Sequence, residues 1–336
     1  MKPWLWLPPK LAHDLSPYAL PLIANLYDER TPTWGSFVWK DIVFKNRLGL
    51  AGGVDKNADS LEAWQRLGCG FVEVGTVTPE AQNANPGQII DRSLIDQALW
   101  NKMGFPSAGA EDVFFNLKAF KENSALPVLV NIGKNRHTSN EGAFLDYVKL
   151  IQHFHDLADA FVVNISSPNT KGLRDLAQPE ILTQFLKPIL KAQDEFQYTK
   201  PLLIKLSPDL ESDDIKQVLD TCIQFKIDGF VLTNTTLERK TQKNFSAEGG
   251  VSGKPVAERS KRALRSAIEH LGSEKAKKLV ISVGGVMTAE DVFERIAMGA
   301  DLVEVYTALI FSGPQFFRKA AKQAHDTKQG FQKTRF

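Results

Sequence analysis

Residues 202–234, LLIKLSPDLESDDIKQVLDTCIQFKIDGFVLTN, contain the pattern that decides the fold. The stretch begins with a short apolar run, Leu202–Leu206, and ends with a second one, Asp228–Asn234. Between them, Ser212 stands at a predicted helix N-cap, and apolar side chains recur at the spacing of one helix face as far as Phe225. We therefore predict a buried strand, an amphipathic helix and a second buried strand, the unit from which parallel sheets are built.

The same strand–helix unit recurs along most of the chain. In one further predicted helix, Thr288–Met298, Thr288 and Asp291 have capping-box spacing, and Gly299 follows at the C-terminal cap position. Eight repeats over about 285 residues favour an α/β fold of the (β/α)8 TIM-barrel type over an open sheet. The predicted strands are Arg47–Ala51, Phe71–Gly75, Leu126–Ile132, Ala160–Ile165, Leu202–Leu206, Asp228–Asn234, Leu279–Gly284 and Asp301–Tyr306.

A doubly wound, two-domain α/β enzyme is the alternative, because 336 residues exceed the usual limit of about 250–300 for one core. Barrels of this length are nevertheless ordinary. The glycine pair after the first predicted strand, Gly52-Gly53, lacks the G-x-G-x-x-G spacing of a dinucleotide-binding turn. We therefore expect a short N-terminal helical extension over residues 1–40 and one barrel over residues 41–336.

Composition narrows the class of protein further. Hydrophobic residues make up 43% and charged residues 24% of the chain, which is typical of a folded domain with a large core. With 41 Lys and Arg against 39 Asp and Glu, the net charge of +2 offers no electrostatic footprint for nucleic acid. Two cysteines, Cys69 and Cys222, are too few for a disulfide or metal framework, so we expect no metal and a reducing compartment.

The first 40 residues differ from the rest because they mix prolines with Trp, Tyr and Leu. Pro17 and Pro21 disfavour one long helix, so we predict two short ones at about Pro9–Asp14 and Leu20–Tyr27. Aromatic and aliphatic residues with lysines nearby suit a segment in a membrane interface. The alternative is that the segment covers the core of the barrel. The chain has no apolar run long enough to span a membrane and no secretory-signal pattern at its start.

A barrel of this type carries its site at the carboxyl ends of its strands, so the residues that end each strand are the candidates. Lys205 lies inside an apolar strand, where a lysine is costly unless it meets an anion or loses its proton. Gly284-Gly285 allows close backbone approach and stands where barrels often bind a phosphate. The other polar or glycine strand ends are Gly52, Gly53, Asp55 and Lys56; Gly75 and Thr76; Asn131; Asn164; Thr233, Asn234 and Thr235; and Tyr306 and Thr307.

Two loop strings also carry amides and hydroxyls, although each on its own is more typical of a turn or loop than of a site. They are Asn164–Thr170 and Asn101–Phe105. In chain order, these strings belong to a longer series: LAGGVDK (50–56), GTVTP (75–79), NKMGF (101–105), NIGKN (131–135), NISSPNT (164–170), KLSPD (205–209), TNTT (233–236), GGVSG (249–253), VGG (283–285) and EVY (304–306).

Together these ten strings closely resemble the dihydroorotate dehydrogenases, specifically the membrane-associated, quinone-dependent class 2 enzymes. The resemblance implies an FMN enzyme of pyrimidine biosynthesis that oxidises dihydroorotate to orotate and passes the electrons to ubiquinone or menaquinone. Two features indicate class 2: Ser167 stands where class 1 relatives carry cysteine, and residues 1–40 form an apolar extension. The implied location is the cytoplasmic face of the inner membrane, as a peripheral protein docked through that extension.

The resemblance also implies the site residues. FMN would be held by Gly52, Gly53, Val54, Asp55, Lys56, Thr76, Asn131, Asn164, Lys205, Thr233, Gly253, Gly285, Tyr306 and Thr307. Dihydroorotate would contact Lys56, Asn101, Lys102, Met103, Gly104, Phe105, Asn164, Asn169, Asn234 and Thr235. Two of these residues depart from the class 2 pattern, because Lys102 stands where arginine is common and Thr307 where serine is common.

Ser167 is the implied catalytic base. Since a serine is a weak base and its motif contains no histidine, its own proton must leave through a water or hydroxyl relay. Lys56 would pair with the substrate carboxylate, and Lys205 would stabilise negative charge on reduced flavin. Two alternatives remain: a Schiff-base aldolase that uses Lys205, and a membrane-associated barrel without catalytic activity.

Overall fold

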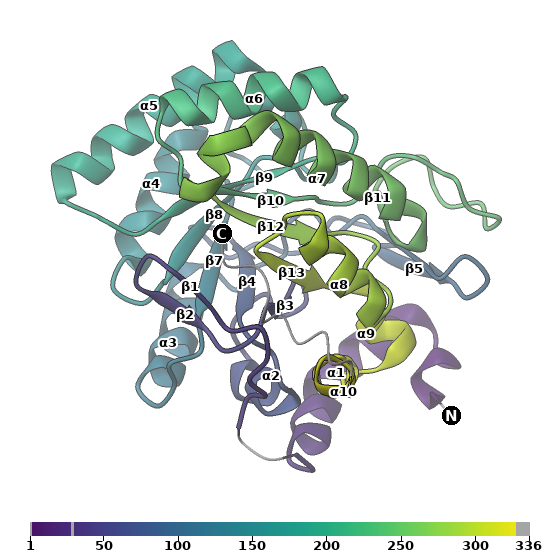
Figure 1. The fold of residues 1–336 in the computed structure, drawn as a ribbon. Coiled ribbons are helices and arrows are strands. Elements are labelled where there is room, and N and C mark those ends of the chain that lie inside the picture. Colours follow the sequence, from purple (N-terminus) through teal and green to yellow (C-terminus); the bar gives the residue numbers. More distant parts are fainter. Residues whose placement is uncertain (1, 28–29, 327–336) are drawn as a thin grey trace.

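Eight parallel strands close into a barrel in the computed structural model, which describes residues 2–27 and 30–326. Each strand pairs with the next in the barrel, and the last pairs with the first (Figure 1). All eight predicted strands and the barrel itself are confirmed. The strands are β3 (Leu48–Leu50), β4 (Val72–Val77), β7 (Val128–Ile132), β8 (Ala160–Asn164), β9 (Leu202–Leu206), β10 (Gly229–Leu232), β12 (Leu279–Val283) and β13 (Leu302–Val305).

Helices cover the outside of the barrel. The capping box of Thr288 and Asp291 is present at the start of its helix, as predicted. At residue 212 the predicted cap is wrong by one position, because the Glu211 side chain and Asp214 form a capping box there. The helices that follow the barrel strands are α2 (Leu61–Leu67), α3 (Ala110–Lys121), α4 (Ala143–Phe154), α5 (Pro179–Phe196), α6 (Ser212–Gln224), α7 (Ala257–Leu271), α8 (Ala289–Ala297), α9 (Thr307–Ser312) and α10 (Phe316–Asp326). Short 3-10 turns are η1 (Pro3–Leu5), η2 (Leu173–Ala177), η3 (Lys254–Val256) and η4 (Gly272–Lys277).

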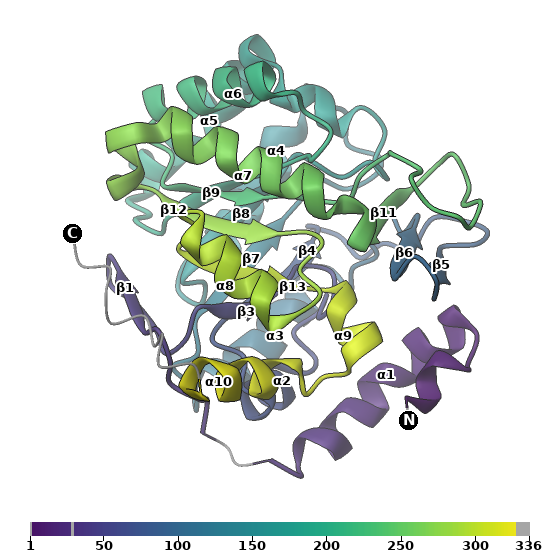
Figure 2. The same ribbon diagram turned by 45° about the vertical axis from the view of Figure 1, so that its right-hand side comes forward.

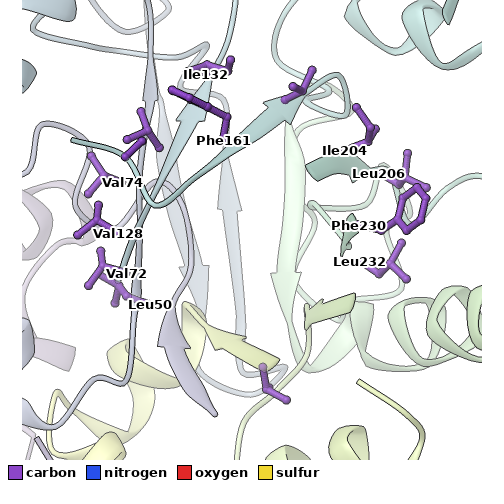
Figure 3. Packing of buried hydrophobic residues seen from close by; sticks show 14 of the residues in the cluster. Leu50, Val72, Val74, Val128, Ile132, Phe161, Ile204, Leu206, Phe230 and Leu232 are labelled. Atoms are coloured by element: carbon purple, nitrogen blue, oxygen red, sulfur yellow. The ribbon is translucent and has the colours of Figure 1, made fainter. Parts of the chain in front are cut away.

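Side chains alternate between two cores along the barrel strands. One set, which includes Val72, Val74 and Val128, packs outward against the helices (Figure 3). Cys222 lies in the same core, as its place on the helix stripe predicts. The other set points into the barrel and packs against a hairpin of β1 (Phe37–Trp39) and β2 (Ile42–Phe44). The hairpin therefore closes the end of the barrel that is opposite the site.

A small antiparallel sheet beside the barrel mouth was not predicted from the sequence. Its strands are β5 (Ile90–Ser93), β6 (Ala98–Asn101) and β11 (Gly250–Gly253), with β6 in the centre. The sheet joins two loops that lie far apart in sequence. It brings Asn101, at the end of β6, opposite Gly250 and next to the mouth.

The N-terminal segment forms one helix, α1 (Pro9–Ala24), so the prediction of two short helices is wrong. Pro17 has no N–H for the His13 carbonyl, but the Ser16 hydroxyl donates to that carbonyl at 2.8 Å. The His13 carbonyl therefore keeps a partner at Pro17, and the helix also continues through Pro21.

One face of α1 covers the barrel and the other faces solvent, with the helix at the periphery of the molecule (Figure 2). Leu20 and Ala24 are buried in the outer core, whereas Tyr18, Leu22 and Leu26 are 77%, 71% and 81% exposed. The segment thus covers the core, one of its two predicted roles, and still presents an apolar outer face. No helix within the described residues is long and apolar enough to cross a membrane.

Candidate active site at the barrel mouth

A cavity lies at the carboxyl ends of the barrel strands and is lined by residues from the loops that follow them. The structure brings nearly all of the site residues that the resemblance implies to this cavity, whereas Gly75, a strand-end candidate, does not line it. Val54, Asp55 and Lys102 are the exceptions among the implied site residues, and their places are described below. The lining residues among the sequence candidates are Gly52, Gly53, Lys56, Thr76, Asn101, Met103, Gly104, Phe105, Asn131, Asn164, Ser167, Asn169, Lys205, Thr233, Asn234, Thr235, Gly253, Gly285, Tyr306 and Thr307.

Amide side chains at the ends of neighbouring strands hold one another in place on the cavity floor. Asn164, at the end of β8, donates to the Thr76 hydroxyl at 3.0 Å and to Asn131 Oδ1 at 3.3 Å. The Ser166 hydroxyl donates to Asn164 Oδ1 at 3.0 Å, and Asn234 Nδ2 donates to that hydroxyl at 2.9 Å. Because these polar groups are fixed by one another, they offer a rigid set of donors and acceptors to a ligand.

Lys205 has the partner that its apolar strand requires. Its ammonium lies 2.5 Å from Glu73 Oε1, which also accepts from Asn131 Nδ2 at 2.6 Å. The sequence analysis missed Glu73 and a second buried carboxyl, Glu304, although each stands in the middle of an apolar strand. A charged residue inside an apolar strand is the sequence signal that could have identified both. The Lys205 amine is thus engaged with Glu73, whereas Schiff-base formation needs a free, neutral amine.

Glu304 lies beside this pair and also lines the cavity. Its side chain is fully buried, and no N–H or hydroxyl group of the described residues donates to its carboxyl oxygens. Burial, and then the nearby Glu73 carboxylate, raise the pKa of Glu304 well above its ordinary value. This direction favours the protonated form of Glu304 beside the ion pair.

Ser167 lies in the loop after β8 and is 5% exposed. Its hydroxyl oxygen accepts from the Asn169 backbone N–H at 3.2 Å, and no histidine is among the residues that line the cavity. Asn169 Nδ2 donates to Asn101 Oδ1 at 2.9 Å. The other Asn169 atom, Oδ1, and the Thr235 hydroxyl have no partner among the described residues. Buried polar atoms of this kind indicate a site that a polar ligand completes.

Arg174, in η2, supports the Ser167 loop and was missed by the sequence analysis. Its guanidinium donates to the carbonyls of Ser166 at 2.9 Å and Thr235 at 3.0 Å, and pairs with Asp209 at 2.8 Å. It therefore ties the loops after β8, β9 and β10 together. A lone arginine in a loop carries no sequence pattern that would reveal this role.

Lys56 is a cation without a carboxylate within ion-pairing distance in the described part of the chain. Burial lowers the pKa of its ammonium to about 8, and Asp55 and Asp59 act in the opposite direction. Asp55 lies outside this cavity and accepts from the N–H groups of Asp59 and Ser60, at 2.9 and 3.0 Å. Burial nevertheless raises the pKa of Asp55 to about 6. Lys56 is thus available for an anionic ligand.

The other two exceptions, Lys102 and Val54, also lie outside the lining of the mouth cavity. Lys102 pairs with Glu248 at the edge of the small sheet, so its ammonium is already engaged away from the cavity. Val54, like Asp55, lines a second cavity of about 720 Å³ between α1 and the barrel. Lys56 and Tyr306 line both cavities, so they form part of the wall between the two.

The second cavity is mostly apolar, with Leu15, Leu20 and Ile23 of α1 on one side. Polar side chains also line it, among them His13 and Arg92 together with Asp14, Ser16, Asp55, Lys56, Asn57, Asp59, Ser60 and Tyr306. Burial lowers the pKa of His13 to about 4, so its imidazole is neutral at pH 7. Arg92 holds the N-terminal segment through the carbonyls of residues 5 and 7. The cavity therefore suits an apolar ligand that carries a few hydrogen-bonding groups.

Comparison with known proteins agrees with this geometry. The family model described as dihydroorotate dehydrogenase matches residues 37–327. The chain is 38% identical over 325 residues to a dihydroorotate dehydrogenase (quinone) of Marinomonas sp. (strain MWYL1), covering 94% of this chain and 92% of the relative. It is 37% identical over 326 residues to the enzyme of that name from Dichelobacter nodosus (strain VCS1703A), covering 95% of each.

The same likeness extends to solved structures. A DHODH from Eimeria tenella, crystallised in complex with ferulenol, superposes with a TM-score of 0.85 at 32% sequence identity. The match covers 95% of this chain and 91% of that chain. Sequence and three-dimensional structure thus point to the same group of proteins.

Proposed function

The chain belongs to the dihydroorotate dehydrogenase family, and we propose that it oxidises dihydroorotate to orotate in pyrimidine biosynthesis, with FMN as its cofactor and a membrane quinone as the electron acceptor. The observation that carries this proposal is the mouth cavity, which gathers Ser167, Lys56 and five asparagines around one space. The two alternatives, an aldolase and a barrel without activity, have no observation in their favour.

The residues of the cavity floor fit the flavin of FMN. A flavin ring carries carbonyl and ring-nitrogen groups along one edge, and the side chains of Asn131, Asn164 and Lys205 offer donors to such an edge. When bound, FMN supplies the acceptor for the hydride that leaves the substrate. Lys205 would favour negative charge on that acceptor, because it lines the cavity, whereas its counterion Glu73 is not among the lining residues.

The other end of the cavity fits the phosphate. Gly253, Gly284 and Gly285 bring backbone there, and the Ser252 and Thr307 hydroxyls lie 2.8 Å apart beside them. None of these groups carries negative charge. Backbone N–H groups and hydroxyls without a nearby carboxylate form the donor set that a phosphate needs.

Lys56 and the asparagines fit dihydroorotate. The substrate is a flat ring with N–H and C=O groups and one carboxylate. The unpartnered Asn169 Oδ1 and Thr235 hydroxyl, together with Asn101 and Asn234, match such a ring, and the Lys56 ammonium matches the carboxylate. These residues would bind the substrate and fix its orientation.

Ser167 would accept the proton. During oxidation, one proton must leave the ring carbon next to a carbonyl as a double bond forms to the neighbouring carbon. The Ser167 oxygen already accepts one hydrogen bond from the Asn169 N–H, which favours negative charge on that oxygen. Nearby Lys56 adds positive charge to the same cavity. With no histidine in the lining, the serine proton would leave through water or a hydroxyl.

The second cavity supports the choice of a quinone as the acceptor. A quinone has an apolar tail and a head with two carbonyl groups, and the cavity combines the apolar face of α1 with His13 and Arg92. The wall that contains Tyr306 and Lys56 separates it from the mouth cavity. Electrons would cross this wall from the cofactor. The exposed apolar face of α1 would rest on the membrane that holds the quinone, as a peripheral contact.

An anaerobic absorbance experiment tests the proposal. The purified full-length chain is expected to show flavin absorption, to lose it on addition of dihydroorotate, and to regain it when a soluble quinone is added. The Ser167→Ala variant should stay yellow and be reduced by dihydroorotate roughly 10²–10⁴-fold more slowly, because a proton acceptor contributes about that much. A chain that cannot bind FMN would overturn the proposal, and an unchanged rate in Ser167→Ala would overturn the role of the serine.

A further inference from the structure

Arg295, on α8, is the largest fully buried side chain of the described residues, and neither the proposed reaction nor the sequence analysis uses it. Burying a guanidinium costs several kcal/mol unless a negative charge lies close to it. No carboxylate forms an ion pair with Arg295 in the described part of the chain, and its Nε has no partner there. Its hydrogen bonds go to neutral oxygens alone.

The three acids closest to Arg295 are engaged elsewhere. Asp291 accepts the N–H groups of Met287 and Thr288 at the start of its helix. Glu294 pairs with Lys261 at 2.7 Å, and Glu258 lies 3.7 Å from the same lysine. These acids therefore act on the buried guanidinium only at longer range, and none of the described carboxylates forms an ion pair with it.

The partners of Arg295 lie directly behind the phosphate end of the mouth cavity. The guanidinium donates to the Gly284 carbonyl at 2.9 Å, to the Ser260 hydroxyl at 2.8 Å and to the Ala257 carbonyl at 3.3 Å. Gly284 and Gly285 line the cavity, and Ala257 is the first residue of α7. Gly285 lies so close to Ala257 that a side-chain carbon on Gly285 would stand 2.3 Å from the Ala257 Cα. Arg295 thus joins the loop after β12 to the start of α7.

This contact also sets the direction of a peptide group. The Gly284–Gly285 bond is trans, and in a trans peptide the C=O and the following N–H point in opposite directions. Because the Gly284 carbonyl points at the guanidinium, the Gly285 N–H points away from it. That N–H has no acceptor among the described residues.

We propose that Arg295 is the buried countercharge for the phosphate of the cofactor and holds the Gly284–Gly285 peptide so that it donates to that phosphate. The inference rests on the proposed function, because it takes FMN to be the ligand. Arg295 is a positioning residue: it acts through the loop and through its charge, and it is not among the residues that line the cavity. The phosphate in turn supplies the negative charge that the folded chain lacks at this point.

The test compares FMN with riboflavin, which differs from it by the phosphate. The full-length chain, freed of flavin, is titrated with each, and the binding is followed by quenching of flavin fluorescence. Wild type should prefer FMN. Arg295→Gln, which keeps hydrogen-bonding capacity without the charge, should lose at least about tenfold of that preference, with riboflavin affinity little changed, since the charge acts across one layer of residues. Arg295→Lys, which keeps the charge, should retain the preference.

Arg265→Gln, an exposed arginine on α7, is the matched control and should behave as wild type. If Arg295→Gln weakens FMN and riboflavin equally, or if Arg295→Lys loses the preference while Arg295→Gln keeps it, Arg295 has a structural role alone and the proposal is wrong. A wild-type chain that binds both flavins equally also overturns it but leaves the proposed function standing. A chain that binds neither flavin overturns both.

Discussion

Some of the charged side chains that are buried in this barrel can be recognised from the sequence, and others cannot. Lys205 was recognised from the sequence because a lysine in a buried strand needs an explanation. Glu73 and Glu304 met the same criterion and were not recognised. Arg174 and Arg295 could not have been recognised, since an arginine in a loop or on a helix looks like a surface residue until the fold shows what surrounds it.

Lys56 should make substrate binding depend on pH. Its pKa is lowered to about 8 by burial, so the ammonium is charged below pH 8 and loses its proton above it. The KM for dihydroorotate, an anion, should therefore rise by up to about tenfold per pH unit above pH 8, where the charged form declines. Steady-state kinetics between about pH 6 and pH 10, in steps of about half a pH unit, measure this change in KM. In Lys56→Gln the KM should be high and nearly independent of pH, and an identical rise in both proteins would contradict the assignment.

Glu304 should make the folded state less stable as pH rises. Its pKa is higher in the folded than in the unfolded chain, so above the unfolded value the folded state binds a proton that the unfolded state has released. The free energy of unfolding then falls with pH, by at most about 1.4 kcal/mol per pH unit for one group. Glu73 raises and Lys205 lowers the pKa of Glu304, and Glu304 in turn acts to raise the pKa of Cys69.

Denaturant unfolding of the wild type and of Glu304→Gln at a series of pH values checks this. The variant should gain stability relative to wild type as pH rises from 5 to 8, roughly the range above the unfolded pKa of a glutamate. Glu290→Gln, at an exposed position on α8, is the control and should show no such gain. Parallel pH dependence of wild type and Glu304→Gln would show that Glu304 is ionised in the folded protein.

Among the elements, the barrel strands were predictable because their buried runs are separated by clear helical periods. The sheet of β5, β6 and β11 was not, because β11 pairs with β6 across about 150 residues of sequence, and the short β5–β6 hairpin has no regular alternation of buried and exposed residues. The single helix α1 was also missed, because the rule against interior prolines does not count a neighbouring hydroxyl that replaces the lost donor. Most of the candidate site was predictable, since the fold places strand ends together.

The outer face of α1 should bind membranes. Tyr18→Ser, Leu22→Ser and Leu26→Ser, combined in one chain, should weaken binding to anionic liposomes and slow turnover with a lipid-soluble quinone. Reduction of the cofactor by dihydroorotate should stay at its wild-type rate, since Leu20 and Ala24 keep the helix on the barrel. Point substitutions are preferable to deletion of residues 1–40, which would uncover that core.

Two exposed apolar residues on other helices, Phe115 and Leu145, provide the control. Their double substitution by serine should leave liposome binding as in wild type. Equal loss in both variants would indicate general surface hydrophobicity, and no loss in the α1 variant would exclude the helix as the contact.

At the scale of the whole molecule, two cavities share one wall. A polar substrate in the mouth cavity and an apolar acceptor beside α1 occupy separate spaces. An apolar inhibitor of the second cavity should therefore lower the maximal rate without raising the KM for dihydroorotate. Initial rates at several inhibitor concentrations test this, and competition between the inhibitor and dihydroorotate would show that the two spaces are one site.

The hairpin of β1 and β2 fills the other end of the barrel with Trp39, Ile42 and Phe44. Glu304 lines the mouth cavity at the opposite end. A ligand bound there should cover Glu304, so we expect exchange of its proton with deuterated water to be slowest when the mouth is full. Because the hairpin packs one end of the barrel, ligands approach the buried carboxyl and amino groups from the other end. A bound ligand should therefore preserve the protonation state that these groups had when it bound.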